Sequence, residues 1–273
     1  MTIRTPLMNV MTAAARKASR NLRRDFGEVE ALQVSRKGPA DFVSAADERV
    51  EAALFAELSR ARPSFGFLME ERGTVAGSDA SHRWIIDPLD GTTNFLHGLP
   101  HFAISIALER EGQLIAGVVF NPLTDEMFMA ERGQGAWLNE SRLRISAREN
   151  LADALFATGI PFKGRPGHAL FGAELAAVSD KVSGIRRFGS AALDLAYVAA
   201  GRFDGYWERN LQPWDIAAGI VLVREAGGMV SDIAGNDGML DGGAVVAATP
   251  ALHGPLRQLL ADARADGGHE QAS

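Results

Sequence analysis

The chain has 273 residues, of which 47% are hydrophobic and 23% charged, as in an ordinary soluble globular protein with one large domain or two smaller ones. Its formal net charge is -6 and it has no long basic block, so no nucleic-acid partner is expected. Because it lacks cysteine, disulfides, thiol catalysis and cysteine-bound zinc are excluded, and a metal would need oxygen ligands or the six histidines.

The N-terminus is basic and has no acid before Asp25, a pattern shared by transit peptides and amphipathic helices. Its apolar residues fall at helical spacing, which favours a structural helix over residues 5–25. No stretch reaches the roughly 20 apolar residues that cross a bilayer, so we expect no membrane span and a cytoplasmic location.

A second helix is predicted after Ser44, which stands three residues before Asp47 as in a capping box, and it should end before Pro63. Lys37 falls in the loop that is expected before this helix. Short strands follow at residues 65–69, 84–87, 102–109 and 113–121, with another in EMFMAERG. This half of the chain is therefore expected to be mixed, with antiparallel neighbours.

The second half alternates strands with helices, which indicates an α/β layer. Strands are predicted in ALFATGIPF, GIRRFG, FDGYWE and GAVVAAT, and helices at residues 169–182, 191–200, 213–226 and near the C-terminus. We divide the chain into an N-terminal α+β half (1–148) with the metal-binding motifs, a C-terminal α/β half (149–265) that completes the site, and a polar tail (266–273). The site should lie between the halves.

Isolated carboxylates follow several of the apolar runs. Asp87 and Asp90 end WIIDPLDGTT, Glu70 ends FGFLME, and Asp215 lies in the first turn of a helix that begins at Pro213. Each alone can be explained as a turn residue or as a partner of a helix dipole. Together, with no basic cluster nearby in the sequence, they indicate a divalent metal bound by hard oxygen ligands, as phosphate chemistry requires.

These motifs carry a resemblance. WIIDPLDGTTNFLHG, preceded by MEE and followed by WDIAAGIVLVREAGG, resembles the inositol monophosphatase family, within the magnesium-dependent, lithium-sensitive phosphatase superfamily. The segments ATGIPF and RFGSAALDLAYVAAGRFDGYWE resemble its bacterial branch. The resemblance implies an α+β fold, a layered α-β-α-β-α sandwich shared with fructose-1,6-bisphosphatase, and a homodimer. It also implies hydrolysis of a small phosphate monoester, foremost inositol 1-phosphate, by direct attack of metal-activated water.

The resemblance further implies a role for each matched residue. The metal ligands would be Glu70, Asp87, the Leu89 carbonyl, Asp90 and Asp215, for two to three Mg²⁺ per site, with Mn²⁺ as an alternative. Glu70 and Thr92 would orient the attacking water, and Asp47 would support Thr92. Substrate would be bound by Asp90, Gly91, Thr92, Gly189, Ser190, Ala191, Glu208 and Asp215.

Alternatives from other classes remain open. An aspartyl-phosphate phosphatase of the haloacid dehalogenase type also joins aspartates to Gly-Thr, but it sets them two apart, whereas here they are three apart around a proline. Histidinol phosphate, fructose 1,6-bisphosphate and adenosine 3′,5′-bisphosphate are substrates of relatives. A regulatory dimer with a binding role is the non-enzymatic alternative. The histidines show no paired ligand spacing, and Arg186 and Arg187 are expected at the solvent or a subunit interface.

Overall fold

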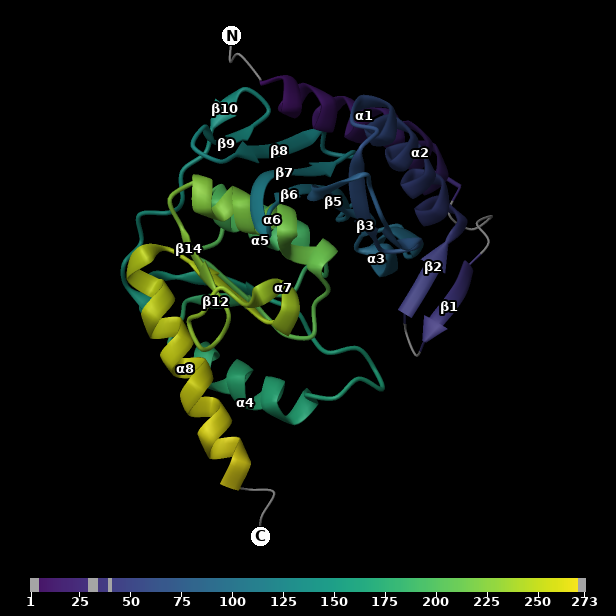
Figure 1. Ribbon diagram of the computed structural model, residues 1–273. Coiled ribbons are helices and arrows are strands. Elements are labelled where there is room, and N and C mark those ends of the chain that lie inside the picture. The colour runs from purple at the N-terminus through teal and green to yellow at the C-terminus, as the bar shows by residue number, and fades with distance from the viewer. Residues whose placement is uncertain (1–4, 29–33, 39–40, 270–273) are drawn as a thin grey trace.

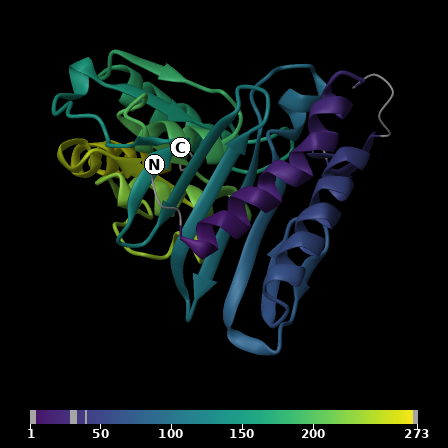
Figure 2. The same ribbon diagram turned by 90° about the horizontal axis from the view of Figure 1, so that it is seen from above.

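The computed structural model describes residues 5–28, 34–38 and 41–269, with side chains described over 5–28 and 45–264. Its elements form five layers (Figures 1 and 2). Helices α1 (Pro6–Phe26) and α2 (Ala45–Ala61) cover one face of a large sheet. Helices α5 (Ala191–Ala199) and α6 (Pro213–Glu225) lie between this sheet and a smaller one. Helices α4 (His168–Ser179) and α8 (Pro250–His269) cover the outer face of the smaller sheet. The predicted α-β-α-β-α sandwich is confirmed.

The large sheet has eight strands in the order β10-β9-β8-β7-β6-β5-β3-β4. Neighbours are antiparallel except β3 and β5, which are parallel. In chain order the strands are β3 (Phe65–Met69), β4 (Gly73–Val75), β5 (Asp79–Asp90), β6 (Ala103–Arg110), β7 (Gln113–Asn121), β8 (Glu126–Glu131), β9 (Gly135–Leu138) and β10 (Ser141–Arg142). The short helix α3 (Thr92–Leu96) joins β5 to β6.

The smaller sheet has five strands in the order β12-β11-β13-β15-β14. Strand β11 is parallel to both neighbours, and β15 is antiparallel to both. The strands are β11 (Leu155–Thr158), β12 (Gly184–Arg186), β13 (Gly205–Glu208), β14 (Met229–Ser231) and β15 (Val245–Ala248). A 3₁₀ turn (Leu151–Asp153) precedes β11, and α7 (Met239–Gly242) precedes β15.

Alternation along the strands divides the apolar side chains between the layers. On β5, Trp84 and Ile86 pack against α1 and α2, while Ile85 faces α5 and α6. On β13, Tyr206 faces α5 and α6 and Trp207 faces α4 and α8. Because successive side chains on a strand point to opposite faces, each sheet is buried on both sides, as its nearly unbroken apolar runs require.

Most predicted helices and strands are confirmed within a few residues, but β5 begins five residues earlier than predicted, and β4, β9, β10, β14, α3 and α7 were not predicted. The expected loop before α2 forms an antiparallel hairpin of β1 (Val34–Gly38) and β2 (Asp41–Ser44). Strands of four or five residues carry too few positions for a reliable alternation, and the Gly-Pro pair between them signals only the turn. The expectations for Lys37 and Ser44 concern side chains outside the described ones. In the part of the chain that the structure describes, no helix is both long and apolar enough to cross a membrane.

Candidate active site

The two aspartates of the DPLD segment lie on the same face of the large sheet because β5 carries a bulge between them. Asp87 is opposite Ser105 on β6, and Asp90 is opposite Ala103, so three steps on β5 match two on β6. Without the extra residue, an odd spacing would send the two carboxylates to opposite faces. Pro88 is tolerated at the bulge because a bulge removes the need for its missing N–H. Both carboxylates therefore face α5 and α6.

Asp90 joins the large sheet to the beginning of α5. Its Oδ2 accepts a hydrogen bond from the Ser190 hydroxyl at 2.6 Å and one from the Ala192 N–H at 2.7 Å. Ser190 is the N-cap of α5, so its hydroxyl is buried and turned toward Asp90. The predicted substrate contact of Ser190 therefore stays a prediction, since the hydroxyl already has this partner.

Asp215 occupies the third position of α6, two residues after Pro213 at its first position, so it lies in the first turn as the sequence predicts. Its Oδ2 accepts a hydrogen bond from the Gln212 N–H at 2.7 Å, which satisfies one unpaired donor at the helix start. The Ser105 hydroxyl on β6 donates to the Trp214 carbonyl at 3.2 Å and fixes this end of α6 against the large sheet.

The three aspartates repel one another, and Asp87 is buried while Asp90 and Asp215 are half-buried. Burial raises the pKa of Asp87 well above its ordinary value, and the charges of Glu70, Asp90 and Asp215 raise it further. Burial likewise raises the pKa of Asp215, with Asp90 as the largest neighbouring charge. The pKa of Asp90 is raised by burial to about 6, although the hydrogen bonds from Ser190 and Ala192 oppose the shift.

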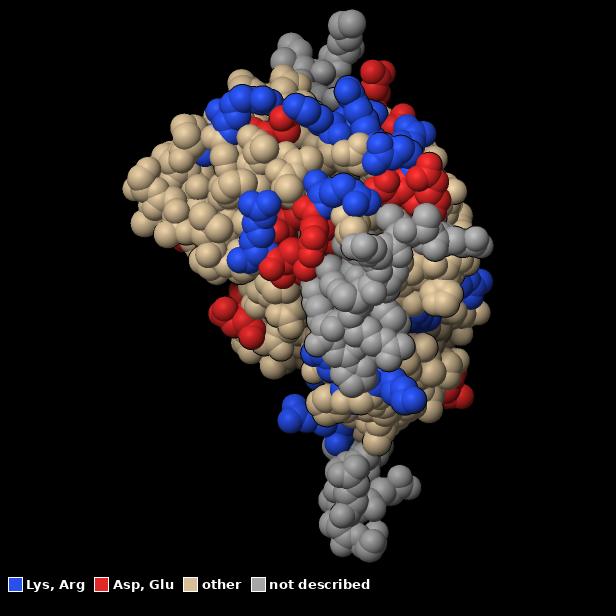
Figure 3. Space-filling view, turned by 90° about the vertical axis from the view of Figure 1, so that its right-hand side faces the viewer, with Lys and Arg blue, Asp and Glu red and all other residues tan. Residues whose placement is uncertain are grey.

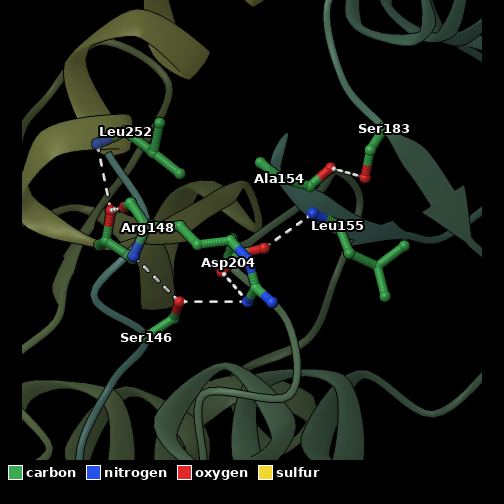
Figure 4. A network of polar contacts seen from close by, with 8 residues as sticks. Ser146, Arg148, Ala154, Leu155, Ser183, Asp204 and Leu252 are labelled. Atoms are coloured by element: carbon green, nitrogen blue, oxygen red, sulfur yellow. Dashed lines mark hydrogen bonds and ion pairs between the residues drawn. The ribbon is translucent and has the colours of Figure 1, made fainter. Parts of the chain in front are cut away.

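Several other buried acids in this protein are paired with arginine. Asp204 accepts from the Leu155 N–H at 2.7 Å and from Arg148 at 3.2 Å, within the network of Figure 4. Asp25, Glu51 and Glu174 likewise have arginine partners. Within the described residues, Asp87, Asp90 and Asp215 form no ion pair, so no described side chain neutralises their charge in this way. Figure 3 shows acidic side chains gathered on one face beside lysine and arginine side chains.

The donor set suits a hard cation. Asp87 accepts the Leu89 N–H with Oδ1 at 2.8 Å and Asp215 uses only Oδ2, so each keeps its second oxygen without a hydrogen bond inside the described structure. Carboxylate oxygens of this kind are what Mg²⁺ prefers. As the side chains stand, no group of three or more His, Asp or Glu in the described residues is arranged to hold a metal ion. The predicted ligand set therefore stays a prediction.

Glu70 and Thr92 stand beside this cluster. Glu70 follows β3, and its N–H donates to the Ile86 carbonyl on β5 at 3.3 Å. The Thr92 hydroxyl lies 3.0 Å from the Leu89 carbonyl and 3.4 Å from Oδ1 of the buried Asp47 on α2. Gly91 has φ 95°, and a side chain there would press on the His101 carbonyl, so glycine is required before Thr92.

Glu208 comes from the smaller sheet, at the end of β13. Its Oε2 accepts a hydrogen bond from the Tyr206 hydroxyl at 2.5 Å. Burial raises the pKa of Glu208 to about 7; the Tyr206 hydrogen bond and the charge of Arg187 lower it, and the charge of Asp90 raises it. The charge of Glu70 acts on Asp87 and Asp215, and that of Glu208 acts on Asp215. The predicted acids of both halves therefore lie in one region. Arg186 and Arg187 are exposed, as expected.

The sequence reasoning missed three residues of this region. Glu51, fully buried on α2, accepts the N–H groups of Glu71 and Arg72 at 2.8 and 3.1 Å and so holds the turn after Glu70. Asn94 donates to the Phe188 carbonyl at 2.7 Å and joins the DGTTN segment to the start of α5. Asp194 is buried on α5. One signal was available: Glu51 stands four residues after Asp47, so the two acids share a helix face with Leu54 and Leu58.

Comparisons with known proteins agree over almost the whole chain. The model of the inositol monophosphatase family matches residues 4–265. A Mesorhizobium japonicum protein named inositol-1-monophosphatase is 60% identical over 253 residues, or 93% of this chain and 95% of that one. Nus factor SuhB of Escherichia coli is 43% identical over 94% of this chain and 98% of its own.

A solved structure agrees in fold as well as in sequence. The crystal structure of extragenic suppressor protein suhB from Bartonella henselae superposes with a TM-score of 0.91 at 57% identity, covering 94% of this chain and 98% of that one. The chain therefore belongs to the inositol monophosphatase family, and it is a phosphoric monoester hydrolase.

Proposed function

We propose that the protein is an inositol-1-monophosphatase, which hydrolyses myo-inositol phosphate to inositol and phosphate with Mg²⁺ as cofactor. The observation that carries this proposal is the cluster of Asp87, Asp90 and Asp215, which repel one another and form no ion pair within the described residues. The 60% identity to a protein of that name supports the substrate. Phosphate release should be measured, with and without Mg²⁺, from inositol 1-phosphate, histidinol phosphate, a sugar bisphosphate and phenyl phosphate.

Two to three Mg²⁺ ions, with Mn²⁺ as an alternative, would be held by oxygen ligands from both sheets. Glu70, Asp87 and the Leu89 carbonyl would form the first site, Asp87, Asp90 and Asp215 the second, and Glu70 would border a weaker third. Bound Mg²⁺ would supply polarisation of the phosphate oxygens and would lower the pKa of the attacking water. The unbonded second oxygens of Asp87 and Asp215 support this assignment.

The protein's own groups would place the reactants. Glu70 and Thr92 would orient the attacking water, and Asp47 would support Thr92 by accepting a hydrogen bond from its hydroxyl group. The N–H groups of Gly91 and Thr92 have no intrahelical acceptor because they start α3, so they are available to a phosphate oxygen. Water would then attack phosphorus opposite the leaving alcohol, and no enzyme-bound phosphate ester would form.

On the alcohol side, Gly189, Ser190, Ala191 and Glu208 would contact ring hydroxyls. Glu208 accepts from a hydroxyl or an amine but repels a second phosphate, which favours inositol phosphate, then histidinol phosphate, over bisphosphates. We also propose that residues 1–148 and 149–265 form the two halves of the site, since Asp90 and Glu208 come from either side of that boundary.

Glu51→Ala should weaken both the fold and turnover. The change leaves the N–H groups of Glu71 and Arg72 without their buried acceptor, which should cost about 1.5–3 kcal/mol of unfolding free energy. Loss of the turn should also move Glu70 and lower kcat by roughly ten- to hundredfold. Urea unfolding and steady-state kinetics measure the two effects. Glu48→Ala, exposed on the same helix, is the matched control. Equal kcat for the two variants would exclude this role of Glu51.

Lithium should inhibit hydrolysis. A small monovalent cation can take an oxygen-only site of aspartates in place of Mg²⁺ but supplies less charge to the reaction. Initial rates of phosphate release at fixed Mg²⁺, with lithium, sodium or potassium chloride at equal concentration, measure this. Selective inhibition by lithium is expected. Identical rates in the three salts would contradict the lithium sensitivity that we propose.

A second role as a regulatory binding protein is the alternative that the comparisons favour, since one relative is named Nus factor SuhB.

A homodimer would suit either role. Leu99 and Phe188 are 52% and 39% exposed, and His101 links them, its ring centre lying 5.0 Å from that of Phe188. We propose this apolar surface as the contact between two copies, in a cytoplasmic protein. Light scattering of the wild type and of Phe188→Ser tests the assembly.

A further inference from the structure

The carboxyl group of Glu208 occupies the space where a side chain of residue 159 would stand. A Cβ on Gly159 would lie 1.9 Å from Cδ and from Oε1 of Glu208, and 2.1 Å from Oε2. Gly159 does not have a left-handed backbone, so glycine is needed here for space and not for conformation. The overlap follows from topology: Thr158, the last residue of β11, is opposite Trp207 on β13, so Gly159 directly after β11 lies beside Glu208 at the end of β13.

Tyr206 fixes the same carboxyl group from a second side. It is fully buried two residues before Glu208 on β13, so both side chains leave the same face of the sheet. Its hydroxyl donates to Oε2 at 2.5 Å. The Thr158 hydroxyl donates to the Trp207 carbonyl at 2.8 Å and keeps the ends of β11 and β13 together. Glu208 is thus held between the Tyr206 hydroxyl and the backbone of Gly159, which has no side chain.

The surroundings of this carboxyl group are mostly acidic. Asp194, 1% exposed on α5, has an Oδ1 without a hydrogen-bond partner in the described structure, and its charge acts on Glu208. The charge of Asp90 also raises the pKa of Glu208, and the charge of the exposed Arg187 lowers it. A second anionic group on a substrate would be repelled here, whereas a hydroxyl group can donate to the fixed carboxyl oxygen.

We propose that Gly159 and Tyr206 are positioning residues that hold the carboxyl group of Glu208 in one place, and that this arrangement selects phosphate esters of polyhydroxy alcohols. The proposal rests on the phosphatase function proposed above and deepens it. Neither residue needs to touch the substrate: Gly159 acts by leaving space, and Tyr206 by one hydrogen bond.

Gly159→Ala tests the space directly. The overlapping atoms are the far end of a flexible side chain, so the protein should fold with Glu208 displaced. The KM for inositol 1-phosphate should rise roughly ten- to hundredfold more than the KM for phenyl phosphate, whose phenyl ring has no hydroxyl group to donate to Glu208. This ratio corresponds to one hydrogen bond to a charged group. Tyr206→Phe should shift the same ratio of KM values in the same direction. Gly172→Ala is the control, since a Cβ there meets nothing within 4 Å.

A double-mutant cycle separates positioning from a general structural effect. In a Glu208→Ala background the overlap is gone, so adding Gly159→Ala should leave both the KM ratio and the melting temperature unchanged. Equal KM shifts for both substrates, or additive effects in the cycle, would overturn the proposal. If Gly159→Ala alone fails to fold while the double variant folds, the overlap is supported and Tyr206→Phe decides the selectivity. A wild type that hydrolyses neither ester would refute the phosphatase function instead, and the melting-temperature cycle would still decide the overlap.

Discussion

Asp90→Asn is expected to lower kcat/KM for inositol 1-phosphate by roughly a hundredfold or more if Asp90 is a metal ligand as proposed, because such a ligand contributes several kcal/mol to transition-state stabilisation. The amide keeps the shape of the side chain, and its oxygen can still accept from Ser190 and Ala192. What the variant loses is one negative charge of the cluster with Asp87 and Asp215. Initial rates over a range of Mg²⁺ concentrations measure the effect. Wild-type turnover at saturating Mg²⁺ would remove Asp90 from the ligand set.

Asp204→Asn is the matched control for this variant, since each aspartate accepts one hydrogen bond from a backbone N–H and one from a side chain. Asp204 is paired with Arg148, so its loss should cost about 1–3 kcal/mol of unfolding free energy and leave the turnover of folded protein unchanged. Asp90→Asn should show the opposite pattern: lost turnover with little loss of stability. The contrast separates a catalytic carboxylate from a structural one.

The pH dependence of stability gives the same test without substrate. Because the pKa of Asp90 is raised from 3.8 to about 6 in the folded protein, its proton stabilises the fold fully below the unfolded pKa and less as the pH rises through the folded one. In metal-free wild type, this contribution is therefore smaller at about pH 8 than at about pH 5. Asp90→Asn has no titrating carboxyl group at this position, so its melting temperature should change less between these pH values.

The residues of the site could be predicted from the sequence better than their geometry. Asp87, Asp90 and Asp215 stand out because each follows an apolar run, but no local pattern shows that a bulge turns Asp87 and Asp90 to the same face. A Pro-Leu pair between two aspartates is equally typical of a turn. The register against β6 decides the matter, and register depends on residues more than ten positions away in the chain.

Contacts between the halves could not be predicted from the sequence for a similar reason. Ser190 was predicted as a substrate contact, yet its hydroxyl donates to Asp90, one hundred residues earlier in the chain. The close approach of the Glu208 carboxyl group to Gly159 depends on which strands are neighbours in the smaller sheet. Helices such as α1 and α6 could be predicted closely, because their apolar spacing and Pro213 are local signals.

Glu70→Gln is the variant that tests how phosphorus is attacked. If Glu70 and Thr92 orient the attacking water, removing the negative charge of Glu70 should lower kcat by roughly 10²–10⁴-fold, the usual contribution of a positioned base. Because substrate is bound by other groups, the KM should change much less. Thr92→Val should lower kcat in the same way, whereas Thr93→Val, exposed next to it on α3, should not. If Glu70 and Thr92 act on one water, the double variant should be less impaired than the product of the two single effects.

The stereochemistry at phosphorus decides between the two hydrolytic mechanisms. One in-line attack by water inverts the configuration of a chiral thiophosphate ester, while a nucleophilic aspartate gives two displacements and net retention. Asp87 is a poor nucleophile in this structure, since it is 2% exposed and its Oδ1 already accepts the Leu89 N–H. Asp90 likewise directs Oδ2 to Ser190 and Ala192. We therefore expect inversion, with the new oxygen coming from labelled solvent in a single turnover. Retention, or a phosphorylated Asp87 or Asp90 trapped during turnover, would replace direct attack by the two-step mechanism.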